Sequence, residues 1–146
     1  MITRREAREL ALQALYQVDV GAEGDPTQGL AVFWGHFNRG EEIDAFAREL
    51  VEGVRAHRER IDALIAASAE HWRLSRLSRV DLNLLRLATF ELLGRPEIPA
   101  SVTINEAIEI ARRFGSDDSA AFVNGVLDAI AGGLGMKERA RSGQAE

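Results

Sequence analysis

Cysteine is absent from the 146-residue sequence, and proline occurs only three times. Without cysteine the chain can form neither a disulfide framework nor a thiolate metal site. Lysine is scarce as well, because one lysine and seventeen arginines make up the 18 basic residues. Arginine suits forked phosphate contacts and base stacking. GC-rich codons produce the same bias, so composition alone leaves both explanations open.

Long hydrophobic runs are also missing: none could span a bilayer, and the start of the chain lacks the apolar segment of a signal peptide. We therefore expect no membrane association and a cytoplasmic location. The net charge is −5, with 23 acidic against 18 basic residues. This balance excludes a general nucleic-acid coat. Any RNA or DNA site has to be local, with arginines clustered on one face.

Apolar residues recur every three or four positions along the chain, which predicts an all-α fold. The expected helices are a first one before a loop at 21–29, a short one over 30–37, a long one over 43–65, and three more that start at Ser78, at Thr103 and at 117–118. Ser78 with Asp81, and Thr103 with Glu106, have the spacing of a capping box. Two glycines at 132–133 should end the last helix.

We expect the helices to form two small bundles packed into one compact domain. The N-terminal half, with the arginine-rich first helix, covers residues 1–70. The C-terminal half covers residues 71–135, and its first stretch, 71–81, is less regular and bridges the halves. Residues 136–146 read as a flexible tail.

Three arginines, Arg4, Arg5 and Arg8, lie in the first turns of the first helix, where positive charge opposes the helix dipole. By helical periodicity they share one flank beside the apolar stripe, and Tyr16 continues that flank. Cations next to an aromatic ring are what single-stranded nucleic acid requires. A solvated helix edge is the simpler interpretation, and the arginines alone do not decide between the two.

Phe122 lies roughly 90° from the centre of the core face of the last helix, so it is either an edge of the core or a stacking platform. Catalytic patterns are missing. The histidines, His36, His57 and His71, lack metal-ligand spacing. The sequence contains no nucleophile elbow, P-loop or dinucleotide fingerprint. We therefore expect no catalytic residue, no metal and no cofactor.

Three stretches together resemble the NusB family of bacterial transcription antitermination factors: ARELALQALYQ at the start, LLRLATFELL with IPASVTINEAIEIARRFG in the second half, and DDSAAFVNGVLD near the end. The resemblance runs from about Arg4 to Ile130. It implies two helical bundles and no enzymatic activity. It also implies binding of boxA-type single-stranded RNA in ribosomal RNA leaders, together with ribosomal protein S10 (NusE), in a complex that joins RNA polymerase.

Residue by residue, the resemblance assigns RNA contacts to five positions: Arg4, Arg5, Arg8, Phe122 and Asp118. It assigns Tyr16 and Asp81 to the S10 side. Some members carry more basic residues before the first helix than MITRREAR does, which predicts weaker RNA binding or stronger dependence on the partner. Two alternatives stay open: a helical adaptor that binds only protein, and a homodimer whose interface hides the RNA face.

Overall fold

The computed structural model describes residues 4–21, 24–37, 39–69 and 74–136. These ranges hold one 3-10 turn, η1 (Leu74–Arg76), and seven α-helices: α1 (Arg4–Val20), α2 (Pro26–His36), α3 (Glu41–Ala56), α4 (Arg58–Ser68), α5 (Arg79–Gly94), α6 (Ala100–Phe114) and α7 (Ser119–Gly133). No strand occurs in the described ranges, and the predicted all-α fold is confirmed. Most of the expected tail, 137–146, and residues 71–73 of the expected bridge lie outside them.

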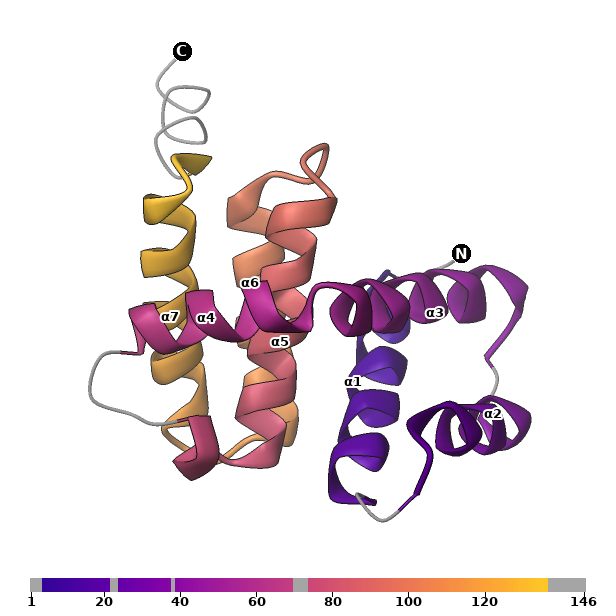
Figure 1. The fold of residues 1–146 in the computed structure, drawn as a ribbon. Helices are drawn as coiled ribbons and strands as arrows, with labels where there is room; N and C mark the ends of the chain where they lie inside the picture. Colours follow the sequence, from indigo (N-terminus) through magenta and orange to yellow (C-terminus); the bar gives the residue numbers. More distant parts are fainter. Residues whose placement is uncertain (1–3, 22–23, 38, 70–73, 137–146) are drawn as a thin grey trace.

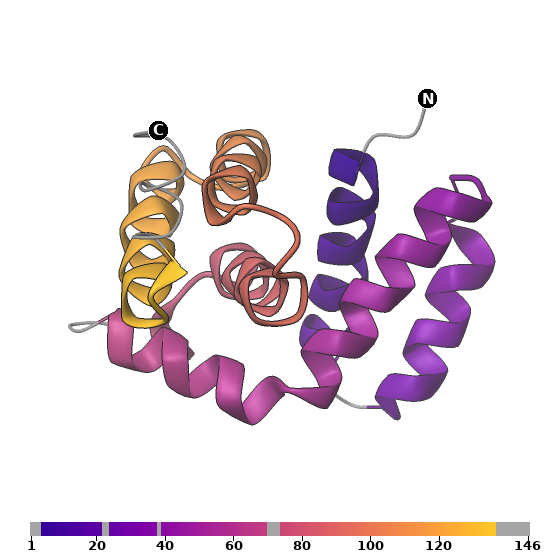
Figure 2. The same cartoon turned by 90° about the horizontal axis from the view of Figure 1, so that it is seen from above.

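The helices form two bundles that share a core. The first bundle contains α1, α2 and α3, and the second contains α5, α6 and α7 (Figures 1 and 2). Within the bundles α1 packs on α2 and α3, and α5 packs on α6 and α7. Both α1 and α3 also pack on α5, so the buried side chains make one continuous hydrophobic cluster. The expected pair of bundles in one compact domain is confirmed.

The expected long helix over 43–65 is wrong, because the backbone leaves helical geometry at His57 (φ −115°, ψ 21°). The break lets α3 lie against α1 while α4 turns away to cover α5 and α7 (Figure 2). Close approach of α3 to α5 needs Gly53, where a Cβ atom would stand 2.1 Å from the ring of Phe90. The division of the chain near residue 70 stays a prediction, and in space α4 lies with the second bundle.

Two helix starts, those of α2 and α6, differ from expectation. Helix α2 begins inside the expected 21–29 loop, because Asp25 accepts a hydrogen bond from the Thr27 N–H at 3.0 Å and Pro26 occupies the first helical position. Helix α6 begins at Ala100, so Thr103 is a buried residue inside the helix and no cap. The predicted capping box at Thr103 is therefore wrong.

Two other predicted boundaries are confirmed. The Ser78 hydroxyl accepts a hydrogen bond from the Asp81 N–H at 3.0 Å and so caps α5. Helix α7 ends at Gly133, at the predicted glycine pair. The Ser78 cap fixes the start of α5, whose residues Arg79 and Asn83 donate hydrogen bonds to Asp19 near the end of α1.

Candidate nucleic-acid interface

The start of α1 carries two exposed arginines, Arg4 and Arg5, as the sequence predicted. Arg5 donates hydrogen bonds to Glu106 of α6, from Nε to Oε1 at 3.1 Å and from Nη2 to Oε2 at 2.5 Å. This ion pair offsets the unfavourable position of Arg5 at a helix N-terminus. Glu106 thus pairs with α1, and the expectation that it caps its own helix is wrong.

Arg8 differs from its expected place at the surface. The residue is only 3% exposed and Glu91 on α5 only 2%. The Arg8 guanidinium donates three hydrogen bonds of 2.8–3.0 Å to the two carboxylate oxygens of Glu91. Its Nη1 also lies 3.5 Å from Glu106. In this arrangement Arg8 joins the two bundles from inside and presents no charge to a ligand.

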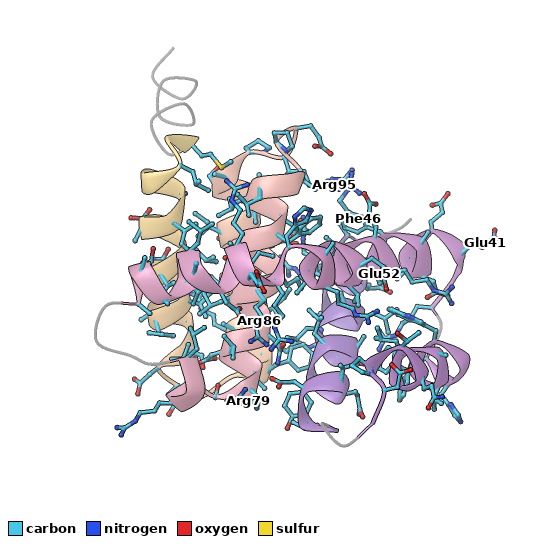
Figure 3. All side chains as sticks on the ribbon, in the orientation of Figure 1. Glu41, Phe46, Glu52, Arg79, Arg86 and Arg95 are labelled. Carbon is cyan, nitrogen blue, oxygen red and sulfur yellow. The ribbon has the colours of Figure 1, made fainter. Side chains whose placement is uncertain are left out.

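Three guanidinium groups lie around the ring of Phe46 on α3, and the sequence did not predict that they are neighbours. The guanidinium carbons of Arg4, Arg8 and Arg95 lie 5.4, 6.0 and 5.0 Å from its centroid. Figure 3 shows Phe46 and Arg95 next to each other where α3 meets the end of α5. Guanidinium groups at this distance from a ring are attracted by its π face. Phe46 therefore holds Arg4 at the junction of the bundles.

A second ion pair connects α1 with the end of α6. Nη1 of Arg113 lies 2.9 and 3.1 Å from the two carboxylate oxygens of Glu9. Between this pair and the Arg5 pair lies a surface hollow of about 320 Å³, lined by Arg4, Arg5, Glu6, Glu9, Glu106 and Arg113. We call these six residues the arginine hollow. Its three arginines come from helices that are far apart in the sequence.

Electrostatics at the hollow favour the ionised pair. The hydrogen bond from Arg5 holds the pKa of the Glu106 carboxyl below its usual value, although partial burial works in the opposite direction. The same hydrogen bond raises the pKa of Arg5. The two groups therefore stay charged at neutral pH and below it.

The depressed pKa of Glu106 predicts an acid-sensitive contribution to stability. The pKa of Glu106 is about 4.5 in the unfolded chain and lower in the folded protein. Its contribution to stability is therefore complete above pH 4.5 and is lost as the pH falls through the lower, folded-state pKa. Glu106→Gln should therefore be less stable than the unsubstituted protein at pH 6, and the difference should shrink as pH falls below 4.5. Urea unfolding at pH 6, 5, 4 and 3 measures this. A difference that is constant with pH would contradict it.

Phe122 and Asp118 belong to the start of α7, whereas Arg4 and Arg5 belong to the start of α1. Helix α6 lies between these two helices (Figure 2). Asp118 is exposed at the N-cap of α7 and makes no side-chain cap hydrogen bond. Phe122 is half-buried and packs against the hydrophobic core. Both predicted residues thus lie at the start of α7, and α6 separates them from Arg4 and Arg5.

Tyr16 and Asp81 lie near a polar contact between the end of α1 and the start of α5. Asp19 accepts hydrogen bonds from Asn83 at 2.9 Å and from Arg79 at 3.3 Å. Tyr16 is 37% exposed one turn before Asp19. Asp81 is half-buried in the first turn of α5, and its Oδ1 is a buried atom without a hydrogen-bond partner. The two predicted partner residues therefore lie on adjoining helix ends.

Sequence reasoning missed Phe46, Arg95, Arg113 and Phe114. Arg113 and Glu9 are 104 positions apart, so no local pattern connects them. The signal for Phe114 was available: an aromatic residue directly before a helix-ending glycine. Within the described ranges no three side chains of His, Cys, Asp or Glu gather as a metal site. Each described helix is too short or too polar to cross a membrane.

Fold and site together define an all-α protein of two joined bundles with an arginine-lined surface hollow. The chain belongs to the NusB family, whose family model matches residues 5–132. The transcription antitermination protein NusB of Geobacter sp. (strain M21) is 53% identical over 146 residues, covering 94% of this chain and all of the relative. The NusB of Myxococcus xanthus is 49% identical over 135 residues, covering 90% of this chain and 96% of that one.

Solved structures agree with the fold. A crystal form of Thermotoga maritima NusB superposes with a TM-score of 0.80 at 42% identity, covering 89% of this chain and 91% of that one. A second solved structure contains the antitermination factors NusB and NusE in complex with double-stranded RNA. Its matching chain superposes with a TM-score of 0.76 at 27% identity, covering 87% of this chain and 94% of that one.

Proposed function

We propose that the protein is a transcription antitermination factor that binds boxA-type single-stranded RNA of ribosomal RNA leaders together with ribosomal protein S10 (NusE). The observation that carries this proposal is the arginine hollow. Three arginines and three glutamates from two helices line this depression, so guanidinium groups gather locally on a protein whose net charge is −5 although the lining itself has no formal net charge. The exposed N–H donors of these guanidinium groups suit phosphate oxygens, and a protein partner supplies the surface that the hollow lacks.

The proposed RNA path begins at Arg4 and Arg5 and ends at Phe122 and Asp118. The exposed guanidinium groups of the first two residues contact phosphates, and the Phe122 ring contacts a base. Arg8 acts indirectly in this scheme: buried against Glu91, it fixes the start of α1 so that its neighbours point outward. The mechanism is binding without chemistry, in the cytoplasm, as one component of the RNA polymerase antitermination complex.

The proposed S10 surface contains Tyr16 and Asp81. An exposed tyrosine and, on the adjoining helix end, a half-buried carboxylate suit contact with a polar protein partner. The two residues lie at the opposite end of α1 from Arg4, so RNA and S10 can be held at the same time. A homodimer in the absence of RNA would compete with these contacts.

The experiment that tests this function is a titration of boxA-type RNA and of a scrambled RNA, each with and without S10. We expect preference for the boxA-type RNA and tighter binding when S10 is present. Asp81→Lys should weaken S10 binding at least tenfold, since it reverses a charge at the interface, and should leave binding of RNA alone unchanged.

The matched control is Glu59→Lys, which reverses an exposed charge in the first turn of α4. It should bind both S10 and RNA normally. An adaptor that binds only protein predicts S10 binding without RNA binding, and that result would contradict the proposal. Equal loss of S10 and RNA binding in Asp81→Lys would mean that the substitution damages the start of α5.

A further inference from the structure

The ring of Phe114 is an aromatic surface beside the arginine hollow that is open to solvent. Phe114 is the last residue of α6 and is 38% exposed. Phe122, which the resemblance to the NusB family assigns to the RNA contacts, is half-buried against the core. A base gains most from a ring with an open face, so exposure favours Phe114 over Phe122.

Arg113 accompanies this ring. Its guanidinium carbon lies 5.3 Å from the centroid of Phe114, within the range of a cation–π contact. The Arg113 side chain is 66% exposed, whereas its partner Glu9 is 6% exposed. The buried carboxylate thus holds an exposed guanidinium in place. Its hydrogen bonds to Glu9 use Nη1, and a guanidinium has further donors on its other nitrogens.

The position of this pair connects the two parts of the proposed RNA path. Arg113 lines the hollow together with Arg4 and Arg5. Phe114 follows it directly, and the turn after Phe114 leads to Asp118 at the start of α7. Helix α6 lies between α1 and α7 (Figure 2), so its end is the place where an RNA strand passing from one to the other would contact the protein.

We propose that Arg113 and Phe114 form a subsite for one nucleotide of single-stranded RNA. The base stacks on the exposed ring of Phe114, and the free N–H groups of Arg113 donate to the adjoining phosphate. Glu9 orients Arg113 and does not itself contact RNA. This inference rests on the proposed function and adds to it a nucleotide position between the arginines of α1 and the first turn of α7.

The test compares RNA binding by the full chain and by Phe114→Leu, which keeps apolar bulk but removes the aromatic face. With boxA-type RNA in the presence of S10, we expect binding to weaken roughly 5- to 150-fold, the range for one lost base–aromatic stack. Phe114→Trp should bind as well as the unsubstituted protein or better. Phe37→Leu is the matched control, because Phe37 is an exposed phenylalanine after α2, in the other bundle.

The second arm measures the phosphate contact. Arg113→Gln should lower the slope of log K against log salt by about 0.7, the value for one contact to a single strand. Melting curves of each variant check that the fold is retained. Normal RNA binding by both Phe114→Leu and Arg113→Gln would overturn the subsite and leave the proposed function intact.

Other outcomes are equally decisive. If Phe114→Leu loses S10 binding but keeps RNA binding, the ring is a protein contact and the subsite is wrong. If the unsubstituted protein binds no RNA even with S10, the proposed function fails and the subsite fails with it. If Phe114→Trp binds as poorly as Phe114→Leu, the ring contributes shape and no stacking, which also overturns the inference.

Discussion

Arg8→Met should lower the free energy of unfolding by about 3–5 kcal/mol, because it leaves the Glu91 carboxylate buried without its partner. Both residues are almost fully buried, and the Arg8 guanidinium supplies three hydrogen bonds to Glu91. The pair also spans the contact between α1 and α5, so its loss weakens the junction of the bundles. Urea unfolding at neutral pH measures the change.

Two controls separate this effect from a general cost of removing an arginine. Arg112→Met breaks a surface pair with Glu109, in which the arginine side chain is 63% exposed, and should change stability by less than about 1 kcal/mol. The double variant Arg8→Met/Glu91→Leu replaces both buried charges with apolar side chains and should recover most of the loss. A single variant as stable as the unsubstituted protein would mean that Arg8 is solvated in solution.

The double variant also tests the role of Arg8 in RNA binding. The resemblance to the NusB family assigns Arg8 as an RNA contact, whereas its burial against Glu91 favours an indirect role. If Arg8 acts only by fixing the start of α1, a well-folded double variant should retain the salt dependence of the unsubstituted protein. A slope lower by one contact would restore Arg8 to the list of phosphate ligands.

Local sequence patterns predicted the features that depend on local interactions. The apolar spacing predicted α1, and the serine at position 78 predicted the start of α5, because a cap needs only residues three positions apart. The start of α2 was also present in the sequence, since Asp25 before Pro26 is a typical N-cap followed by a first helical residue. The glycines of residues 21–29 predicted a loop over the whole stretch, so the helix start at Pro26 was not expected.

Long-range pairing explains what the sequence did not reveal. Helical periodicity located Arg8 beside the apolar stripe, but only the position of Glu91, 83 residues away, decides that it is buried. Likewise Glu106 has the spacing of a capping residue, but its carboxylate accepts hydrogen bonds from Arg5, 101 residues away. The break at His57 depends on the surfaces that α3 and α4 cover. None of these partners can be found from local spacing alone.

The double variant Arg4→Ala/Arg5→Ala should bind boxA-type RNA weakly and with a flatter salt dependence. Each arginine that neutralises a phosphate releases counterions when RNA binds, so the slope of log K against log salt should fall by about 0.7 per contact, or about 1.4 for two. The matched control is Arg58→Ala/Arg60→Ala, which removes two exposed arginines from α4, on the opposite side of the second bundle from α6 (Figure 2).

The central claim is tested most directly by the slope of log K against log salt for these three proteins with S10 present. The slope is measured between roughly 50 and 300 mM salt, where counterion release changes affinity. Our account predicts equal slopes for the unsubstituted protein and the α4 control, and a slope smaller by about 1.4 for Arg4→Ala/Arg5→Ala. Three parallel lines would contradict it, because the arginines at the start of α1 would then contact no phosphate.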